Sequence, residues 1–399
     1  MRSRTVAIAT IAALGLALLG SACTDAGVVL TPPGSTMIPG SVRVDVLAAG
    51  PYHTCGIDGG RLLCWGSNEM GELGLGDTTP RTSPATIAGA DWKEVVVGAT
   101  HTCARRTAGS LWCWGDNAEG QLGIGPSAAV STPSFVSLSA PAQQLASTYA
   151  HSCAIDEDHA LFCWGENVEG QLAQDDPFSA GVGVNRDHPV QVGMDHDWLV
   201  ADTGQGHSCG IRAPGNLWCW GRNSEGEQGL GPGSPGQTRT PGRVGTAEDW
   251  RDVRVGQETS CGLRGTGSLW CWGGNESGEC GLGDTTKREV PTAVGTFIDW
   301  VEISTDTFHT CGVRSDGSLY CWGRNIEGEL GLGDANARLT PTRVDDATDW
   351  ISVAAGRFHT CALKRDRSVL CTGQNDKGQL GLGDTTSRSK LTLVALPPG

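Results

Sequence analysis

The sequence predicts an all-β protein that folds as a seven-bladed β-propeller, and three observations support this prediction. A unit of about fifty residues recurs seven times along the chain, which is a spacing typical of propellers, solenoids and repeat arrays. Each unit holds two cysteines with turn residues between them. The chain of 399 residues contains 59 glycines, too many for a helical protein, because glycine inside a helix costs about 1 kcal/mol relative to alanine.

The first 22 residues have the pattern of a signal peptide. Two arginines precede an apolar run over residues 6–19, which has the length of a secretory signal and is too short to span a bilayer comfortably. Small residues then lead to Cys23, as at the site where bacterial lipoproteins are cleaved and lipidated, although Gly20 stands where such sites usually have leucine. We expect residues 1–22 to be removed and Cys23 to carry a lipid. Ordinary secretory cleavage after Ala22 is the alternative.

Residues 23–41 are expected to form a flexible tether, and residues 42–399 to form the propeller. The tether is rich in proline, glycine, serine and threonine, a composition that favours an extended, mobile chain. No later stretch is long and apolar enough to span a membrane. We therefore expect an exported chain that meets the membrane only through Cys23. Its expected place is the outer membrane or the cell surface, or otherwise the periplasm or the extracellular space.

Each repeat is expected to contain four short strands. It opens with Asp-Trp and an apolar residue three positions later, as at Trp300 and Ile303. A strand around His-Thr-Cys follows, then a return strand that ends in Cys-Trp-Gly, a glycine-rich turn, and a last segment with a proline such as Pro341. Apolar residues occupy both faces of the central hairpin, so these strands are expected to be covered on both sides. Four short strands stacked against neighbouring sheets are typical of a propeller blade.

The turns of these hairpins place the two cysteines of each repeat opposite each other. In the sixth repeat, pairing Cys311 with Cys321 leaves a three-residue loop that ends at Gly317, where such loops favour a glycine with positive φ. In the first repeat the cysteines are one residue closer, which leaves the two-residue loop Gly59-Gly60. Residues opposed in this way lie within disulfide distance. The expected bridges are Cys55–Cys64, Cys103–Cys113, Cys153–Cys163, Cys209–Cys219, Cys261–Cys271, Cys311–Cys321 and Cys361–Cys371.

Buried reduced cysteines and metal ligands are the alternatives to these bridges. An exported chain meets an oxidising compartment, which favours disulfides. Zinc favours two cysteines separated by two to four residues, a spacing that does not occur in this chain. Cys280 stands where other repeats have leucine and is expected to be a small buried apolar residue, with a Cys23–Cys280 bridge as the alternative.

The repeats resemble the regulator of chromosome condensation repeat family. The resemblance rests on tandem HTCxL, LxCWG and GxNxxGQLGLGD elements and covers about residues 42–399. It implies a seven-bladed propeller but specifies little about function. The founding member of the family is an exchange factor for a small GTPase on chromatin, whereas similar repeats occur in protein-binding scaffolds and in a secreted bacterial inhibitor of β-lactamase. We do not expect exchange activity, because no repeat carries an insertion long enough to act as that protein's wedge.

Charge and motifs exclude several function classes. The net charge of -15 repels phosphate backbones, so no nucleic-acid partner is expected. The chain contains neither Gly-x-Ser-x-Gly nor His-Glu-x-x-His, so we expect no catalytic residue, no cofactor and no metal. Six histidines occupy one slot of the repeat, where a structural hydrogen-bonding role is expected: His53, His101, His151, His207, His309 and His359, with Thr259 in the remaining blade.

The repeat is least regular between the third and fourth units, and this segment is the expected ligand-binding loop. Longer, irregular loops on a rigid scaffold often carry binding sites. Its candidate residues are Asp175, Asp176, Phe178, Arg186, Asp187, His188, Asp195 and His196. Aspartate and histidine together can bind a cation, but a solvated loop is the simpler interpretation.

These observations predict an exported, monomeric, lipid-anchored propeller that binds a protein or a surface ligand and is not an enzyme. The alternatives are a carbohydrate-active or hydrolytic propeller in the cell envelope and, second, an exchange-factor-like protein. A pair of carboxylates in the central funnel would favour the enzyme. A broad aromatic patch on one propeller face would favour binding.

The two ends of the chain are expected to meet in one blade. The first repeat already has its opening strand, and the apolar run over residues 391–396 lacks the proline of the other repeats. We expect this run to pair with the beginning of the chain, because sharing a blade would remove free strand edges.

Overall fold

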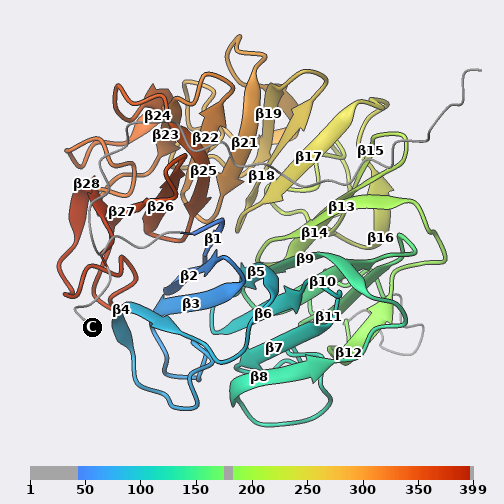
Figure 1. Ribbon diagram of the computed structural model, residues 1–399. Helices are drawn as coiled ribbons and strands as arrows, with labels where there is room; N and C mark the ends of the chain where they lie inside the picture. The colour runs from blue at the N-terminus through green and yellow to red at the C-terminus, as the bar shows by residue number, and fades with distance from the viewer. Residues whose placement is uncertain (1–43, 175–182, 396–399) are drawn as a thin grey trace, which may run out of the picture. The chain divides into compact units, whose positions relative to one another are not determined.

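Seven four-stranded antiparallel sheets follow one another around a central channel (Figure 1). The computed structural model describes residues 44–174 and 183–395, all within the compact unit Ile38–Gly399. The sheet that comes first in the chain lies beside the sheet that comes last, which closes the ring of blades. The predicted all-β, seven-bladed propeller is therefore confirmed. The expected signal peptide (residues 1–22), Cys23 and the tether lie outside the described residues.

Each blade uses four consecutive strands, from the channel outward. The innermost strands are β1 (Val46–Ala49), β5 (Trp92–Val97), β9 (Ala142–Thr148), β13 (Trp198–Thr203), β17 (Trp250–Val255), β21 (Trp300–Thr305) and β25 (Trp350–Ala355). The second strands are β2 (His53–Asp58), β6 (His101–Arg106), β10 (His151–Asp156), β14 (His207–Arg212), β18 (Thr259–Arg264), β22 (His309–Arg314) and β26 (His359–Lys364). The third strands are β3 (Arg61–Gly66), β7 (Leu111–Gly115), β11 (Leu161–Gly165), β15 (Asn216–Arg222), β19 (Ser268–Gly273), β23 (Leu319–Gly323) and β27 (Val369–Gly373). The outermost strands are β4 (Arg81–Thr86), β8 (Val130–Val136), β12 (Arg186–Gln191), β16 (Gln237–Arg243), β20 (Arg288–Ala293), β24 (Arg338–Arg343) and β28 (Arg388–Leu393).

Strand direction assigns every connection to one of two faces. Because neighbouring strands are antiparallel, the turns from first to second strand and the glycine-rich connections from third to fourth strand lie at one end of each sheet. We call this end the turn face. The hairpins between second and third strands and the connections between blades lie at the other end, which we call the hairpin face.

The central hairpins have the predicted register, and a disulfide joins each predicted cysteine pair. Cysteines face each other across the second and third strands with Cα atoms 4.1 Å apart in all seven pairs. Gly317 has φ of +78° at the third loop position, and His159 and Arg367 take φ of 59° and 72° at the same position of their repeats. Glycine is thus favoured at this position but not required.

Cys280 is a buried free thiol, as its place in a leucine slot suggests. Its Sγ lies 3.4 Å from the carbonyl oxygen of Gly274, which it can reach as a donor. Burial raises the pKa of this thiol, so it stays protonated. The alternative bridge to Cys23 lies outside the described residues.

The hydrophobic cores lie between blades and not within them. The face of the sixth blade that carries Cys311, Val313 and Leu319 packs against Trp350 of the seventh blade. The opposite face presents Trp322 to the core that the sixth blade shares with the fifth. Both faces of the sixth blade's hairpin are therefore covered, as the sequence predicts.

A ring of histidine hydrogen bonds links neighbouring blades. The Nε2 atom of each histidine lies 2.7–2.9 Å from a threonine or serine hydroxyl of the next blade. The pairs are His53–Thr102, His101–Ser152, His151–Ser208, His207–Ser260, His309–Thr360 and His359–Thr54. In the fifth blade Thr259 replaces histidine and donates to the carbonyl of Gly274 within its own blade.

The protonation state of these histidines follows from their partners. The Thr102 hydroxyl donates its only proton to the carbonyl oxygen of Glu72, 2.8 Å away, so His53 must donate from Nε2. Its Nδ1 then carries a lone pair and has no partner among the described residues. Burial lowers the pKa of His53 to about 3 and that of His359 to about 4, because a second proton would bring a charge without an acceptor. The rings are neutral and structural.

The predicted pairing of the two chain ends is wrong. Among the described strands, β28 pairs only with β27, with Thr392 opposite Cys371, and β1 pairs only with β2. The described residues begin with the innermost strand of one blade and end with the outermost strand of another, so each described blade is complete in itself. Side chains close the ring instead: Thr54 Oγ1 lies 2.9 Å from Nε2 of His359 and 3.0 Å from the carbonyl oxygen of Gln379.

Candidate functional site

The central channel has a volume of about 350 Å³ and a polar lining. It is lined by the innermost strands, whose alternate residues point into it. Its polar residues include Glu94, Gln144, Asp202, Arg254, Glu302 and Ser304. All six belong to β5, β9, β13, β17 and β21, whereas β1 and β25 line the channel with valine, leucine and alanine.

These polar side chains connect innermost strands that do not pair with each other. Gln144 donates to the carbonyl oxygen of Ala201 (2.7 Å) and accepts from its N–H (2.9 Å). Asp202 accepts from the N–H of Val255 at 2.7 Å. Each side chain therefore satisfies backbone N–H or C=O groups of the neighbouring blade, which a paired strand would satisfy in a continuous sheet.

The channel carboxylates are also engaged with charged or hydroxyl groups. Glu94 forms an ion pair with Arg105 at 2.5 Å, and Arg254 lies 3.3 Å from Asp252. Glu302 accepts from the Ser352 hydroxyl at 2.8 Å. Burial raises the pKa of Asp202 to about 6 and that of Glu302 to about 7. Each carboxyl group thus has a structural partner, which leaves little support for a free catalytic pair.

Tyr149 reaches across the channel at the turn face. It follows β9 with φ of +51°, a left-handed conformation that is uncommon for a bulky residue. Its hydroxyl lies 3.1 Å from Oε1 of Gln257 and 2.5 Å from Oγ1 of Thr307, which belong to the fifth and sixth blades. Thr307 Oγ1 lies 3.0 Å from Oδ1 of Asp306, so four groups form one hydrogen-bonded chain.

Burial raises the pKa of Asp306 to about 7, so this carboxyl group takes up a proton near neutral pH. Within the chain, the Tyr149 hydroxyl donates to Oε1 of Gln257 and the Thr307 hydroxyl donates to Oδ1 of Asp306.

Beside the channel, the turn face carries a cluster of arginines and aromatic rings from the sixth, seventh and first blades. Phe308 and Phe358 stack with centroids 5.6 Å apart and planes 18° apart. The guanidinium of Arg324 lies 4.6 Å from the Phe358 centroid and that of Arg357 lies 4.9 Å from it. Arg357 also donates to the hydroxyl of Tyr52 at 3.0 Å. All five side chains are partly exposed, and we call them the arginine–phenylalanine cluster.

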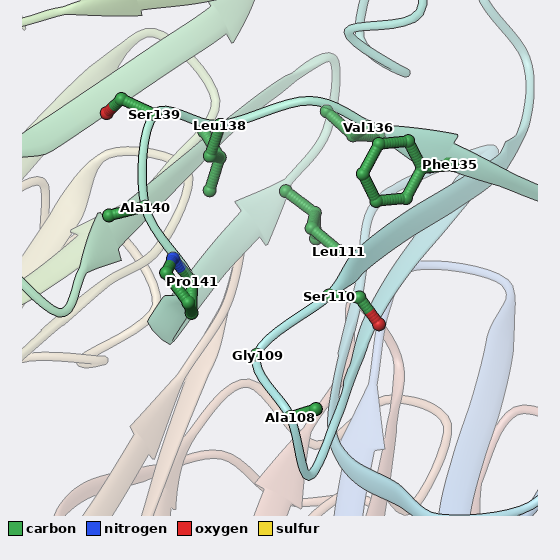
Figure 2. Close-up of a pocket in the computed structure, with 10 residues that line it drawn as sticks. All are labelled: Ala108, Gly109, Ser110, Leu111, Phe135, Val136, Leu138, Ser139, Ala140 and Pro141. Atoms are coloured by element: carbon green, nitrogen blue, oxygen red, sulfur yellow. The ribbon is translucent and has the colours of Figure 1, made fainter.

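A smaller pocket of about 250 Å³ lies on the hairpin face between the second and third blades (Figure 2). Its walls come from the β6–β7 hairpin, the end of β8 and the segment between β8 and β9. The lining is largely apolar and includes Leu111, Val136, Leu138 and Pro141. It is separate from the channel, whose lining residues it does not share.

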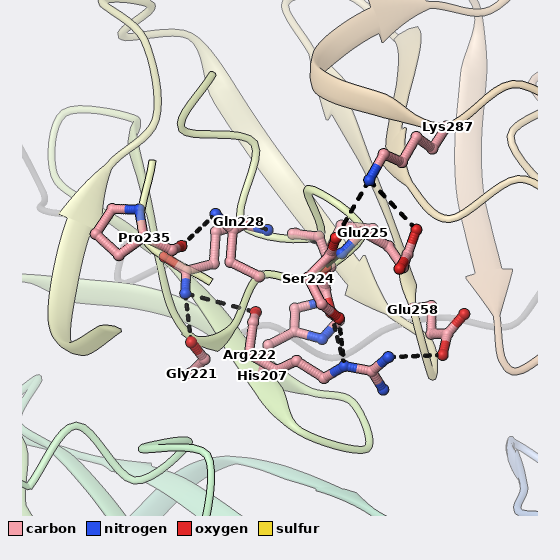
Figure 3. A network of polar contacts seen from close by, with 12 residues as sticks. His207, Gly221, Arg222, Ser224, Glu225, Gln228, Pro235, Glu258 and Lys287 are labelled. Carbon is pink, nitrogen blue, oxygen red and sulfur yellow. Dashed lines mark hydrogen bonds and ion pairs between the residues drawn. The ribbon is translucent and has the colours of Figure 1, made fainter. Parts of the chain in front are cut away.

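On the turn face of the fourth and fifth blades, ion pairs replace the aromatic cluster (Figure 3). Arg222 occupies the same repeat slot as Arg324 and lies 2.9 Å from Glu258 and 3.2 Å from Glu227. Lys287 lies 3.5 Å from Glu225 and donates to the carbonyl of Ser224. Both arginines pair with a glutamate of their own glycine turn, since Arg324 lies 2.7 Å from Glu329. The two regions differ in the neighbouring blade, where Arg222 meets the carboxylate of Glu258 and Arg324 meets the ring of Phe358.

The structure separates the residues of the expected ligand loop. Arg186, Asp187 and His188 lie in strand β12 and not in a loop, because this segment forms the outermost strand of the third blade. Asp195 and His196 lie in the connection that follows, at the hairpin face, where Asp195 pairs with Arg212 at 2.7 Å. His196 Nδ1 lies 3.1 Å from the carbonyl oxygen of Asp158.

The remaining members of that set, Asp175, Asp176 and Phe178, lie outside the described residues. Asp187 Oδ1 lies 2.9 Å from Nδ1 of His188 at the start of β12. Asp195 and His196 follow the other end of this strand, so the two pairs lie apart. Among the described residues, no group of three or more histidine, cysteine, aspartate or glutamate side chains is placed to hold a metal ion. A binding role for this segment remains a prediction.

The channel carboxylates, Tyr149 and the arginine–phenylalanine cluster were not predicted from the sequence. A signal for the cluster was present, because the residue before the repeated histidine is aromatic only in three blades: Tyr52, Phe308 and Phe358. These three blades are neighbours once the ring closes. No comparable signal marked Tyr149, whose partners are two and three blades away.

Among the described residues, no helix has the length and apolar character that crossing a membrane requires.

Comparison with known proteins identifies the repeats. Two models of the regulator of chromosome condensation (RCC1) repeat together match more than half of the chain. One matches residues 59–105, 108–155, 266–313 and 316–363, and the other matches residues 92–121, 142–171, 201–227, 250–279 and 350–379.

Curated relatives match over parts of their length. The ultraviolet-B receptor UVR8 of Arabidopsis thaliana is 29% identical over 256 residues, which cover 62% of this chain and 45% of the receptor. The probable E3 ubiquitin-protein ligase HERC3 of Homo sapiens is 36% identical over 93 residues, 23% of this chain and 9% of the ligase. The chain therefore spans less than half of the length of either relative.

Solved structures share the fold at low sequence identity. Human WBSCR16 aligns with a TM-score of 0.75 and 20% identity, covering 85% of this chain and 95% of its own. Prp20p of Saccharomyces cerevisiae aligns with a TM-score of 0.73 and 22% identity, covering 88% and 87%. These similarities describe the architecture alone.

Asp306→Asn is expected to stabilise the protein at high pH. The unfolded chain releases this proton near pH 4, whereas the folded protein keeps it to about pH 7. The free energy of unfolding of the wild type therefore falls as pH rises between these values. An asparagine still accepts from the Thr307 hydroxyl and carries no charge at any pH, so the variant should exceed the wild type by on the order of 1–3 kcal/mol at about pH 8 and match it at about pH 4.

Urea unfolding over a pH series measures this difference. The exposed Asp346→Asn provides the control and should show no comparable pH-dependent gain. A gain in Asp306→Asn that is the same at all pH values would contradict a protonated Asp306.

Proposed function

The chain belongs to the regulator of chromosome condensation (RCC1) repeat family, and on this basis we propose that it is an exported, non-enzymatic, monomeric scaffold that binds a protein partner through the turn face of its propeller. The repeats supply a rigid disc, and the partner is selected by side chains that differ from blade to blade. The observation that carries the proposal is the arginine–phenylalanine cluster.

The composition of the cluster is that of a protein-binding surface. Arginine, tyrosine and phenylalanine are enriched at protein interfaces, where they supply large contact area, and arginine and tyrosine also supply polar groups. The stacked Phe308 and Phe358 hold the Arg357 guanidinium over a ring face, so little side-chain freedom remains to be lost on binding. Ile326, 66% exposed in the same glycine turn as Arg324, adds apolar area beside the cluster.

The channel supports binding less well and catalysis still less. Its carboxyl groups hold neighbouring blades together, so their use as an acid and a base would disturb the ring. Tyr149 also crosses the opening on the turn face. The carbohydrate-active or hydrolytic alternative therefore lacks a free pair of carboxylates.

Exchange-factor activity is not part of the proposal. Binding to Gsp1p and to histones has been described for Prp20p. At 22% identity the similarity supports the fold and does not extend to those partners. The spacing of the present repeats also leaves no room for a long inserted wedge.

Location in the cell envelope is supported by the amino-terminal pattern and by the cysteines. Residues 1–22 have the pattern of an export signal that ends at Cys23. Seven disulfides inside short hairpins suit an oxidising compartment. We place the mature chain on the outer membrane or cell surface, held by a lipid on Cys23.

Phe358→Ala is expected to remove most of the partner binding. The substitution deletes the ring that holds both guanidinium groups, and truncation of an interface anchor costs about 2 kcal/mol or more. Recovery of the partner from native envelope by the purified chain, measured by quantitative mass spectrometry after cross-linking, should fall at least tenfold. Leu199→Ala, which removes an exposed apolar side chain near the hairpin face, is the matched control.

A folded Phe358→Ala variant that recovers the same proteins in the same amounts as the wild type would contradict binding through the cluster. Loss of recovery in Leu199→Ala and not in Phe358→Ala would place the binding surface on the opposite face.

Cys23→Ala is expected to abolish lipid attachment. Cells that express the wild-type chain and are fed a labelled fatty acid should yield a labelled protein, because the lipid joins the cysteine at the cleavage site. The variant should remain unlabelled and leave the membrane fraction. Equal labelling of both proteins would reject the anchor, and Cys280→Ala serves as the control for a cysteine outside the signal.

A further inference from the structure

Two of the seven blade interfaces lack the tryptophan that fills the other five. In five interfaces a buried tryptophan at the start of the innermost strand packs between neighbouring blades: Trp92, Trp198, Trp250, Trp300 and Trp350. The third blade has Ala142 at this position, and the first blade has Val44. Between the second and third blades the space that an indole occupies elsewhere is therefore left without its ring.

The walls of this space are the same as in the filled interfaces. Trp250 packs against Leu217 and Val244, and Trp300 packs in one core with Leu269 and Val294. Leu111 and Val136 occupy the corresponding positions of the second blade, and both belong to the core that contains Ala142. Leu111 and Val136 therefore match two of the residues that share a core with an indole in the filled interfaces.

A pocket of about 250 Å³ opens at this interface (Figure 2), and its lining includes Leu111 and Val136 but not Ala142, which is buried beside it. Leu111, Leu138 and Pro141 surround it from the hairpin and from the segment before β9. Pockets that hold drug-sized ligands have volumes of about 300–1,000 Å³. This pocket is smaller, so it suits one side chain better than a large cofactor.

An exposed aromatic ring stands at the rim of the pocket. Phe135 is 56% exposed and packs edge-on against Trp112, with centroids 5.6 Å apart. Two other repeats place arginines, Arg243 and Arg343, at this strand position. A large exposed apolar side chain beside an apolar pocket marks a site of contact with another molecule.

We propose that this pocket binds an aromatic side chain, above all the indole of a tryptophan, presented by a partner protein on the hairpin face. The proposal rests on the scaffold function proposed above and adds to it the chemistry of one contact. The incoming ring would pack against Leu111 and Val136, the counterparts of residues that share a core with Trp250 and Trp300. Burial of an aromatic ring supplies both area and edge-to-face contact, here with Phe135 and Trp112 at the rim.

The rest of the chain offers little to fill the pocket from within. Outside the described residues, 1–43 and 396–399 contain no phenylalanine, tyrosine or tryptophan, and 175–182 contain only Phe178. No tryptophan of the chain lies outside the described residues. The proposal therefore assigns the ring to another molecule.

Fluorine NMR of 5-fluoroindole with the full-length chain tests the pocket directly. The probe signal should broaden in the presence of the wild type, and Ala142→Trp, which supplies the missing ring from within, should weaken this binding at least tenfold. Ala140→Phe, which fills the pocket from its rim, gives the same test with a smaller disturbance of the core. Ser137→Ala, exposed and outside the lining, should bind as the wild type does.

A folded Ala142→Trp variant that binds the probe as well as the wild type would overturn the assignment, and so would the absence of wild-type binding up to the solubility limit. Equal competition by cyclohexylmethanol would overturn the preference for aromatic rings. None of these results depends on the turn face, so failure here leaves the capture experiment with Phe358→Ala intact.

A blocked Gly-Trp-Gly peptide distinguishes a partner's side chain from a free aromatic molecule. If a protein supplies the ring, this peptide should bind at least as tightly as 5-fluoroindole and should displace it, while blocked Gly-Ala-Gly should not. Binding of the free indole without binding of the tryptophan peptide would overturn the assignment to a partner protein.

Discussion

The propeller depends on hydrogen bonds that cross from each blade to the next, because none of the described strands is shared between blades. Every sheet is complete in four consecutive strands, so the backbone ladder ends at each blade. Buried tryptophans and the cysteine faces supply apolar contact between sheets, but such contact does not by itself fix how one sheet sits on another. Directional hydrogen bonds do: at six of the seven junctions a histidine donates to a hydroxyl of the next blade, and that hydroxyl donates to a carbonyl of the blade before. The indole of Trp114 donates to the same carbonyl as Thr102, and at the junction of the fifth and sixth blades Thr310 and Trp322 donate to Glu279 without a histidine. Even closure of the ring, from His359 to Thr54, uses this interaction.

This linkage also places the proposed binding surface. Phe308 and Phe358 directly precede His309 and His359, so the bonds that lock the sixth blade to the seventh and the seventh to the first also hold the two phenyl rings in their stack. Disulfides inside the hairpins secure each blade, and hydrogen bonds between blades set the distance from one variable side chain to the next. The scaffold and the surface are thus coupled, with specificity carried by positions just outside the repeated motif.

The sequence predicted what is local to one repeat and failed where the ring brings repeats together. Gly317 and the Gly59-Gly60 pair indicated the hairpin loops and hence the cysteine register, because these turns are determined by a few adjacent residues. The expectation that the chain ends share a blade was wrong, because the order of strands within a blade is not set by any single residue. Residues 186–188 were expected in a loop, yet they complete the third blade as part of β12. Tyr149 could not have been found, since its partners Gln257 and Thr307 become neighbours only across the channel.

The role of the histidine ring is tested most directly by amide hydrogen exchange in His359→Ala. The alanine leaves Thr54 without its donor and opens the junction between the seventh and first blades, which should cost about 1–3 kcal/mol of stability. Exchange should quicken in β1, β2 and β26 before it changes in the blades on the far side of the ring. The exposed His188→Ala is the matched control. Exchange and stability equal to those of the control would contradict the account, because the blades would then be held together without the ring.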